Sequence, residues 1–440
     1  MRKLFNALFA VVCTGTIAVA QTPERTLELD FPSLHIGVAE NPEGPTGGVV
    51  FYFPTGAKTA VDVRGGSPAT INTEVLQLSY ESSFVDAITI AGGSSYGLEF
   101  ATGVAAELRE RRGGSGDWND IATVAGAIVF DLGPRRFNTS YPTKEMGAAA
   151  LRAAVPGRFP LGGRGAGRFT TQGGFFGGWE YRQHSGQGGA MRTLGTTKVA
   201  VFTVVNSLGA VVDRQGRVVR CLQPTPGAPC PLITDYLADA IRRRGATTTA
   251  SLEPRRENTT ITLVVTNEKL EYWALQRLAV QVHTSMARAI QPFHTLNDGD
   301  VLFAVSTGEV DNPSLNIDVL STLASETAWD AVLASVPDLP ERAMDVIPIP
   351  AEVTNRYEGT YEFAPGARLT VTRAADGRLT VEATGTRDVW SFKLKNRYEL
   401  QPVTRAEFIS TNPRRDRLLF TIDGVTLNPG PWEMKARLAQ

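Results

Sequence analysis

Five apolar runs rich in β-branched residues, each bounded by turn residues, constrain the fold of this chain more than any other feature. They cover residues 48–54, 87–91, 122–132, 198–205 and 260–265. Such runs predict strands that are buried on both faces. Apolar residues at helical spacing lie at residues 98–108, 275–290 and 320–336. They predict amphipathic helices that cover a sheet. We therefore expect residues 27–336 to form a layered α/β body.

The pattern changes beyond a proline-rich linker at residues 337–350. Short alternating segments with turn signals follow, at residues 361–363, 369–372, 379–382 and 418–422. This spacing is typical of a small antiparallel β domain, which we place at residues 351–440. The domain contains no His or Cys, so we expect the chemistry in the first domain. Two domains also fit the length of the chain.

Residues 1–20 have the features of an export signal. Arg2 and Lys3 precede a largely apolar run, and Ala18-Val19-Ala20 forms a small-x-small pattern that a signal peptidase cleaves. The run is too short for a convincing membrane span. We expect cleavage after Ala20, a mature chain that begins near Gln21, and a periplasmic or secreted protein.

The composition narrows the function. The net charge of −1 gives no electrostatic case for nucleic acid or an anionic membrane as partner. None of the four histidines stands at metal-ligand spacing, so we expect neither a metal nor another cofactor. Cys221 and Cys230 flank a proline-rich loop; in an oxidising compartment they form either a disulfide or two free thiols. Residues 162–189 hold eleven glycines without a phosphate-binding fingerprint, which indicates close approach to a ligand or a mobile loop.

One candidate nucleophile is Ser95. It lies in Gly93-Ser94-Ser95-Tyr96-Gly97, between a predicted strand and a predicted helix, which is the context of a nucleophile elbow. An α/β-hydrolase would also need a later histidine, and His283 or His294 is available. A glycine-rich turn meets this short pattern easily by chance.

The other candidate is Thr259, in a polar loop that leads into the predicted strand at residues 260–265. A threonine hydroxyl is a weak nucleophile unless a base lies beside it, and a free α-amine on the same residue can be that base. The amine exists only if the Asn258–Thr259 bond is cut, which the hydroxyl itself can do through an N-to-O acyl shift. On local grounds alone, a threonine-rich start of a strand is the better interpretation.

A series of sequence blocks changes the balance between Thr259 and Ser95. The blocks run in order through residues 29–336 and are Asp30-Phe31-Pro32, Glu43-Gly44-Pro45-Thr46-Gly47, Ala60-Val61-Asp62-Val63-Arg64-Gly65-Gly66, Ala91-Gly92-Gly93-Ser94-Ser95-Tyr96-Gly97-Leu98-Glu99, Asn258-Thr259-Thr260-Ile261, Gln281-Val282-His283-Thr284-Ser285-Met286 and Gln291-Pro292-Phe293-His294-Thr295, with Asp298-Gly299-Asp300 following. In these blocks the chain resembles the nylon-oligomer hydrolases. These enzymes belong to the autoprocessing family of DmpA-type and β-peptidyl aminopeptidases.

The resemblance implies roles for individual residues. Thr259 matches the N-terminal nucleophile of the family, and Asn258 the residue released as a new C-terminus. Asn206 matches an asparagine whose amide stabilises the tetrahedral oxyanion. Asp298 and Asp300 match an acidic pair that orients Thr259 and holds a cation, either the α-amine or a substrate ammonium.

The same resemblance implies a pocket, a fold and an assembly. The turn at Ser94, Ser95 and Tyr96 would line the pocket without supplying the nucleophile. The fold would be the four-layer αββα arrangement of N-terminal-nucleophile hydrolases, made from residues 21–258 and 259–336 as one intertwined domain. The family also implies a homo-oligomer of cleaved pairs.

One departure bears on the substrate. Nylon hydrolases carry a lysine in the glycine-rich segment, where this chain has Gly174. Activity on nylon oligomers is therefore in doubt, and amine-terminated peptides or β-peptides become better candidates. The C-terminal domain has a separate likeness: the block from Tyr357 to Glu362 resembles the small β-barrel appended to some exported β-lactamase-like hydrolases, for which we expect an accessory role.

The sequence thus predicts a self-cleaving amide hydrolase or aminopeptidase that acts on peptides, β-peptides or amide oligomers. A serine esterase that uses Ser95 and an exported binding protein without catalytic activity are the alternatives.

Overall fold

The computed structural model describes ten stretches of the chain: residues 25–41, 44–77, 83–132, 140–177, 181–222, 228–245, 257–336, 345–374, 376–430 and 432–439. The predicted export signal, its cleavage site after Ala20, and most of the predicted linker lie outside these residues. No helix among the described residues is long and apolar enough to span a membrane.

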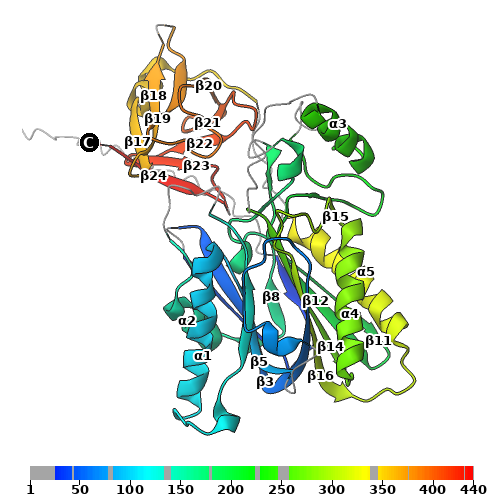
Figure 1. Cartoon of the computed structure of the whole chain (residues 1–440). Coiled ribbons are helices and arrows are strands. Elements are labelled where there is room, and N and C mark those ends of the chain that lie inside the picture. The colour runs from blue at the N-terminus through cyan, green and yellow to red at the C-terminus, as the bar shows by residue number, and fades with distance from the viewer. Residues whose placement is uncertain are drawn as a thin grey trace, which may run out of the picture.

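A large mixed sheet forms the body of the molecule (Figure 1). Its strand order is β11-β12-β14-β16-β3-β5-β6-β4; in addition, β2 pairs with β3, and β7 pairs with β2. β14 pairs antiparallel with β12 and parallel with β16. The strands are β11 (Gln187–Leu194), β12 (Thr197–Asn206), β14 (Thr259–Glu268), β16 (Val301–Val310), β3 (Thr46–Val63), β5 (Phe84–Ala91), β6 (Val124–Ile128), β4 (Thr70–Ile71), β2 (His35–Asn41) and β7 (Val155–Pro156).

Strand β3 continues past the end predicted for it. The sequence indicated a strand over residues 48–54, with Pro54 at its end, but β3 runs on to Val63. Its pairing with β5 shifts register between Tyr52 and Ala57. Pro54 lies within this irregularity, and a bulge is one of the few places where a strand accommodates proline. One half of β3 pairs with β2, and the other half pairs with β16.

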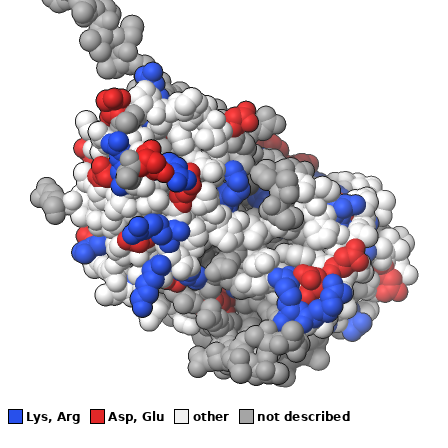
Figure 2. Space-filling model, turned by 90° about the horizontal axis from the view of Figure 1, so that it is seen from above, with Lys and Arg blue, Asp and Glu red and all other residues white. Residues whose placement is uncertain are grey.

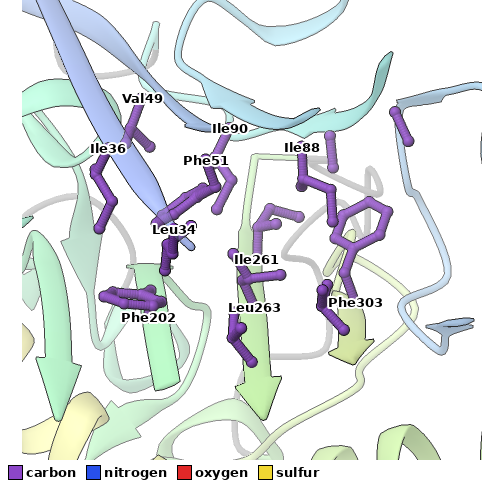
Figure 3. Packing of buried hydrophobic residues seen from close by; sticks show 14 of the residues in the cluster. Leu34, Ile36, Val49, Phe51, Ile88, Ile90, Phe202, Ile261, Leu263 and Phe303 are labelled. Atoms are coloured by element: carbon purple, nitrogen blue, oxygen red, sulfur yellow. The ribbon is translucent and has the colours of Figure 1, made fainter. Parts of the chain in front are cut away.

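The two halves of the sheet face each other across an apolar core (Figure 3). Alternate residues of the central strands point into it, such as Ile261 and Leu263 of β14 and Phe303 of β16. They meet Phe51 and Ile88 from β3 and β5. The intervening residues face outward, which is the alternation expected of strands covered on both faces.

Helices cover both outer faces, so the body has four layers in the order αββα (Figure 1). α1 (Glu99–Arg111) and α2 (Lys144–Arg152) pack on the half formed by β3, β5 and β6. α4 (Tyr272–Ser285) and α5 (Ile317–Ser335) pack on the half formed by β12, β14 and β16. Helices α1, α4 and α5 were expected from sequence, whereas α2 and the outlying α3 (Ile233–Gly245) were not.

Several short strands complete the body. They form three antiparallel pairs outside the main sheet or at its margin. The pairs are β1 (Thr26–Glu28) with β8 (Arg158–Pro160), β9 (Thr171–Gln172) with β10 (Gln183–His184), and β13 (Ala210–Val211) with β15 (Ile290–Gln291). Near β13, Cys221 and Cys230 form a disulfide with a Cα–Cα distance of 5.8 Å, which decides between the two states left open by the sequence.

The C-terminal strands close into a barrel, in agreement with the small antiparallel β domain predicted there. A short helix, α6 (Ala351–Thr354), precedes it. The barrel strands are β17 (Gly359–Ala364), β18 (Ala367–Arg373), β19 (Leu379–Gly385), β20 (Arg397–Pro402), β21 (Glu407–Ser410), β22 (Arg417–Phe420), β23 (Gly424–Leu427) and β24 (Met434–Leu438).

The barrel packs against the glycine-rich segment of the body. Phe169 belongs to the apolar cluster of the barrel. The ring of His184 stacks on Trp432, with centroids 4.2 Å apart, and on Trp390, at 5.5 Å. Burial of His184, together with nearby Arg414, lowers its pKa well below the ordinary value. The histidine is therefore a neutral part of this interface.

On the face seen in Figure 2, basic and acidic side chains are interspersed.

Candidate active site

Thr259 is the first residue of β14 and lies opposite Asn206, the last residue of β12. Both residues are buried, as is Asn258. The chain is continuous between Asn258 and Thr259, so the structure describes the geometry before any cleavage. A third segment joins them, since Asn258 pairs with Asp298 in an isolated parallel bridge. The fold thus brings together the ends of two strands and the loop before β16.

The carbonyl oxygen of Asn258 is held from two sides. The Thr259 hydroxyl donates to it at 2.5 Å, and the backbone N–H of Gly299 donates to it at 2.9 Å. A side chain at Gly299 would collide with this arrangement, because a Cβ there would lie 2.9 Å from Thr259 Oγ1. The hydroxyl therefore touches the carbonyl group that it would attack, and a backbone donor lies where negative charge would develop on the oxygen.

Asn206 contacts the same region but a different carbonyl. Its amide nitrogen donates to Phe130 O at 2.8 Å and to Glu257 O at 3.2 Å, and its Oδ1 accepts from the Thr171 N–H at 3.0 Å. Both amide hydrogens are thus committed in the continuous chain. The donor to the Asn258 carbonyl is Gly299, which the sequence analysis did not single out. That Asn206 stabilises the oxyanion formed from a substrate stays a prediction.

Asp298 and Asp300 are buried side by side with Gly299 between them. Asp300 accepts from the Thr260 N–H at 2.8 Å, and Asp298 accepts from the Leu208 N–H at 3.1 Å and from Thr295. Burial, followed by the charge of Asp300, raises the pKa of Asp298 to about 7. Two carboxyl groups this close disfavour simultaneous ionisation, so Asp298 is only partly ionised near neutral pH.

Two histidines extend this cluster away from Thr259. His294 Nδ1 lies 3.0 Å from Asp300 Oδ2, and the His294 ring packs edge-on against His283. His283 Nδ1 in turn lies 2.9 Å from Asp62 Oδ2. Burial lowers the pKa of His283, against the hydrogen bond to Asp62, which raises it. His283 is therefore a packed histidine held by Asp62.

A buried arginine that the sequence analysis missed lies beside Asn258. The Arg182 guanidinium donates to Asn258 Oδ1 at 2.6 Å and to Thr171 Oγ1 at 2.9 Å. It occupies the space over Gly174, where a Cβ would come within 2.9 Å of the guanidinium. Arg182 therefore places a positive charge beside Gly174, the position at which the sequence lacks the expected lysine. In the sequence, Arg182 could have been noticed only as an arginine within the glycine-rich segment.

The turn at Ser94, Ser95 and Tyr96 lies at the end of β5 and is connected to the same region. The Ser94 N–H donates to Val129 O, next to the Phe130 carbonyl that Asn206 contacts. Ser95 and Tyr96 are exposed, and their role as a pocket wall stays a prediction.

The described residues do not form a catalytic triad around Ser95. Each histidine has its ring contact elsewhere: His35 with Tyr52, His184 with the barrel, and His283 and His294 with aspartates. Among the residues that the structure describes, no group of three or more His, Cys, Asp or Glu side chains gathers as a metal site.

Comparison with known proteins identifies the family. The family model described as peptidase family S58 matches residues 34–359, which is most of the chain. This chain belongs to peptidase family S58. The match ends at Gly359, the first residue of the barrel, so the S58 region coincides with the α/β body.

Relatives of this S58 chain include enzymes named for hydrolysis of amide oligomers. A 6-aminohexanoate-oligomer endohydrolase of Kocuria sp. is 39% identical over 339 residues, which cover 74% of this chain and 89% of that protein. The enzyme of the same name from Paenarthrobacter ureafaciens is 40% identical over 326 residues, or 72% of this chain and 87% of that protein. An uncharacterized aminopeptidase of Mycobacterium tuberculosis is 35% identical over 310 residues, or 68% and 84%.

Solved structures support the fold. A Burkholderia sp. beta-aminopeptidase superimposes with a TM-score of 0.51 at 17% identity, over 72% of this chain and 87% of that one. The four-layer fold and the family predicted from the sequence are thereby confirmed. The S58 chain is an N-terminal-nucleophile peptidase or amidohydrolase, and a serine esterase based on Ser95 is not favoured.

Proposed function

We propose that this amide hydrolase cuts itself between Asn258 and Thr259 and then uses Thr259 as its nucleophile. The observation that carries the proposal is the double contact on the Asn258 carbonyl oxygen. The Thr259 hydroxyl approaches it to 2.5 Å while the Gly299 N–H donates to it at 2.9 Å.

In the first step, Thr259 Oγ1 attacks the Asn258 carbonyl carbon and its proton passes to the departing amide nitrogen. The C–N bond breaks and an ester forms between Asn258 and the threonine oxygen. Water then hydrolyses the ester, which leaves a carboxylate on Asn258 and a free α-amine on Thr259. The Gly299 N–H would stabilise the oxyanion of the first step, and such a donor is typically worth ~3–4 kcal/mol.

In turnover, the new α-amine of Thr259 takes the hydroxyl proton as Oγ1 attacks a substrate amide, and later returns a proton to the leaving amine. The unperturbed pKa of an α-amine is about 7.7–8.0, which suits this task near neutral pH. Asp298 and Asp300 would orient Thr259 through the Thr260 N–H and the Gly299 backbone, and would balance a cationic amine. In the cleaved enzyme, Asn206 would be the second oxyanion donor once residue 257 moves away.

We further propose that the substrates are amino-terminal peptides, β-peptides or amide oligomers. The names of the relatives favour amides with an amine at one end. We also propose that residues 1–20 direct export to the periplasm or beyond, and that the cleaved pairs assemble into a homo-oligomer.

A denaturing gel of freshly purified and incubated protein tests the cut. We expect two fragments that begin at Gln21 and Thr259 by N-terminal sequencing, and one uncut chain for Thr259→Ala. Ser95→Ala serves as the matched control and should cleave like wild type. A wild-type chain that stays intact yet hydrolyses amides contradicts the proposal. An intact chain without hydrolytic activity would instead indicate a binding protein.

A further inference from the structure

Arg182 is a buried cation that contacts the side chain of the residue to be released. Arg182 and Asn258 are 4% and 2% exposed. One nitrogen, Nη2, donates to Asn258 Oδ1 at 2.6 Å, and Nη1 donates to Thr171 Oγ1 at 2.9 Å. A hydrogen bond to a charged donor in such a place is among the stronger ones in proteins.

The backbone around Arg182 is held by the C-terminal barrel. Arg414 of the barrel donates to the Arg182 carbonyl oxygen. Two residues further along, His184 stacks on Trp432 and Trp390. Because both the side chain and the backbone are anchored, the guanidinium keeps a fixed position relative to Thr259.

Self-cleavage and turnover form the same chemical group on the same atom. If the proposed function holds, self-cleavage produces an ester between the Asn258 acyl group and Thr259 Oγ1, and turnover produces an ester between a substrate acyl group and Thr259 Oγ1. The two acyl groups must be attacked by water at one place. The Asn258 side chain therefore marks the position that a substrate side chain takes in the acyl-enzyme.

We propose that Arg182 is a specificity-determining residue that selects acyl groups with an oxygen acceptor where Asn258 carries Oδ1. This oxygen lies on the fourth carbon, counted from the carbonyl carbon that is attacked. N-terminal asparaginyl and aspartyl amides carry it there. A leucyl group has nearly the same shape but presents methyl groups to Nη2, and a 6-aminohexanoyl chain presents a methylene. Both lose one charge-assisted hydrogen bond at a buried site.

The experiment compares p-nitroanilides of asparagine, aspartate, leucine and 6-aminohexanoate on fully processed wild-type enzyme. We expect kcat/KM for the asparaginyl substrate to exceed that for the leucyl substrate at least about tenfold. Arg182→Met should bring the two substrates close to parity, and Thr171→Val, which removes one anchor of the guanidinium, should lower the ratio in part. Arg192→Met is the matched control, because Arg192 forms a surface ion pair with Asp330, and it should keep the wild-type ratio.

The outcomes separate this inference from the proposed function. A processed wild-type enzyme that hydrolyses leucyl and asparaginyl substrates equally well overturns the inference alone. So does an unchanged ratio in Arg182→Met, or in Thr171→Val if the Arg182 variant fails to process. A wild-type chain that never processes and hydrolyses none of the four substrates refutes the proposed function, and the inference with it.

Discussion

Replacing Gly299 with alanine adds one methyl group beside the proposed nucleophile. The new Cβ would lie 2.6 Å from the Ser67 carbonyl oxygen and 2.9 Å from Thr259 Oγ1. Gly299 does not adopt a positive φ, so alanine adds no backbone strain of its own. The N–H that donates to the Asn258 carbonyl is also retained. The substitution therefore tests the position of the hydroxyl and not the loss of a donor.

The size of the effect follows from the distance. Ordinary contacts of a Cβ begin at 3.4 Å, so the hydroxyl must move by about 0.5 Å to make room. A displacement of about 1 Å at a reacting group can cost 10²-fold in rate. We therefore expect self-cleavage of Gly299→Ala to be slowed about tenfold, or about 1.4 kcal/mol in the barrier, and more if the crowding against Ser67 adds to it.

The assay follows the loss of intact chain on denaturing gels after rapid purification, and fits a first-order rate. Gly116→Ala is the matched control, since a Cβ at Gly116 meets nothing within 4 Å. Thermal unfolding of each variant shows whether it is folded. A Gly299→Ala protein that melts like wild type and cleaves at the wild-type rate would refute the assignment of Thr259 Oγ1 as the attacking atom.

Three further predictions concern stability. Asp298 has a pKa of about 7 when folded and an ordinary value of 3.8, so its contribution to stability is full below pH 3.8 and is lost as the pH rises to about 7. The unfolding free energy of Asp298→Asn, measured with urea, should rise relative to that of wild type by up to about 1.4 kcal/mol per pH unit across that window. A difference between the two proteins that does not change with pH would contradict the raised pKa. Replacing Cys221 and Cys230 with serine should lower the unfolding free energy by about 2–3 kcal/mol, a difference that a reductant abolishes. Phe202→Ala should cost about 3–5 kcal/mol because Phe202 is fully buried between the two halves of the sheet, whereas replacing the half-exposed Phe84 with alanine should cost under about 0.5 kcal/mol.

The fold was largely predictable because its strands are buried on both faces. Such strands appear in the sequence as unbroken β-branched runs, and β12 and β14 match their predicted ranges closely. The continuation of β3 beyond Pro54 was not predictable, since only the three-dimensional pairing reveals that the proline sits at a bulge. Helix α2 was missed because it spans only nine residues and contains Gly147, a residue that is unfavourable inside a helix. In the structure Gly147 allows close contact with α1, where a Cβ would meet Phe100 O at 2.0 Å.

The candidate site was predictable only where a side chain carries the chemistry. Thr259 and Asp300 are recognisable by residue type and by their neighbours in the sequence. The Gly299 N–H has no side-chain signature, because any residue supplies a backbone donor. Arg182 lies 76 positions before its partner Asn258, and no local pattern relates them. The partners of Asn206 in the continuous chain are likewise set by the fold.

The strand order has a consequence for the folding of the precursor and for the lifetime of the cleaved protein. β14 and β16 lie between β12 and β3, so a cut before Thr259 leaves two polypeptides whose strands alternate within one sheet. Folding of the precursor is unimolecular, whereas reassembly of the separated pieces would be a second-order reaction that slows on dilution. Only the uncut precursor would then fold at a rate that does not depend on protein concentration. After that, its lifetime would depend on the unfolding barrier rather than on an equilibrium with the unfolded state.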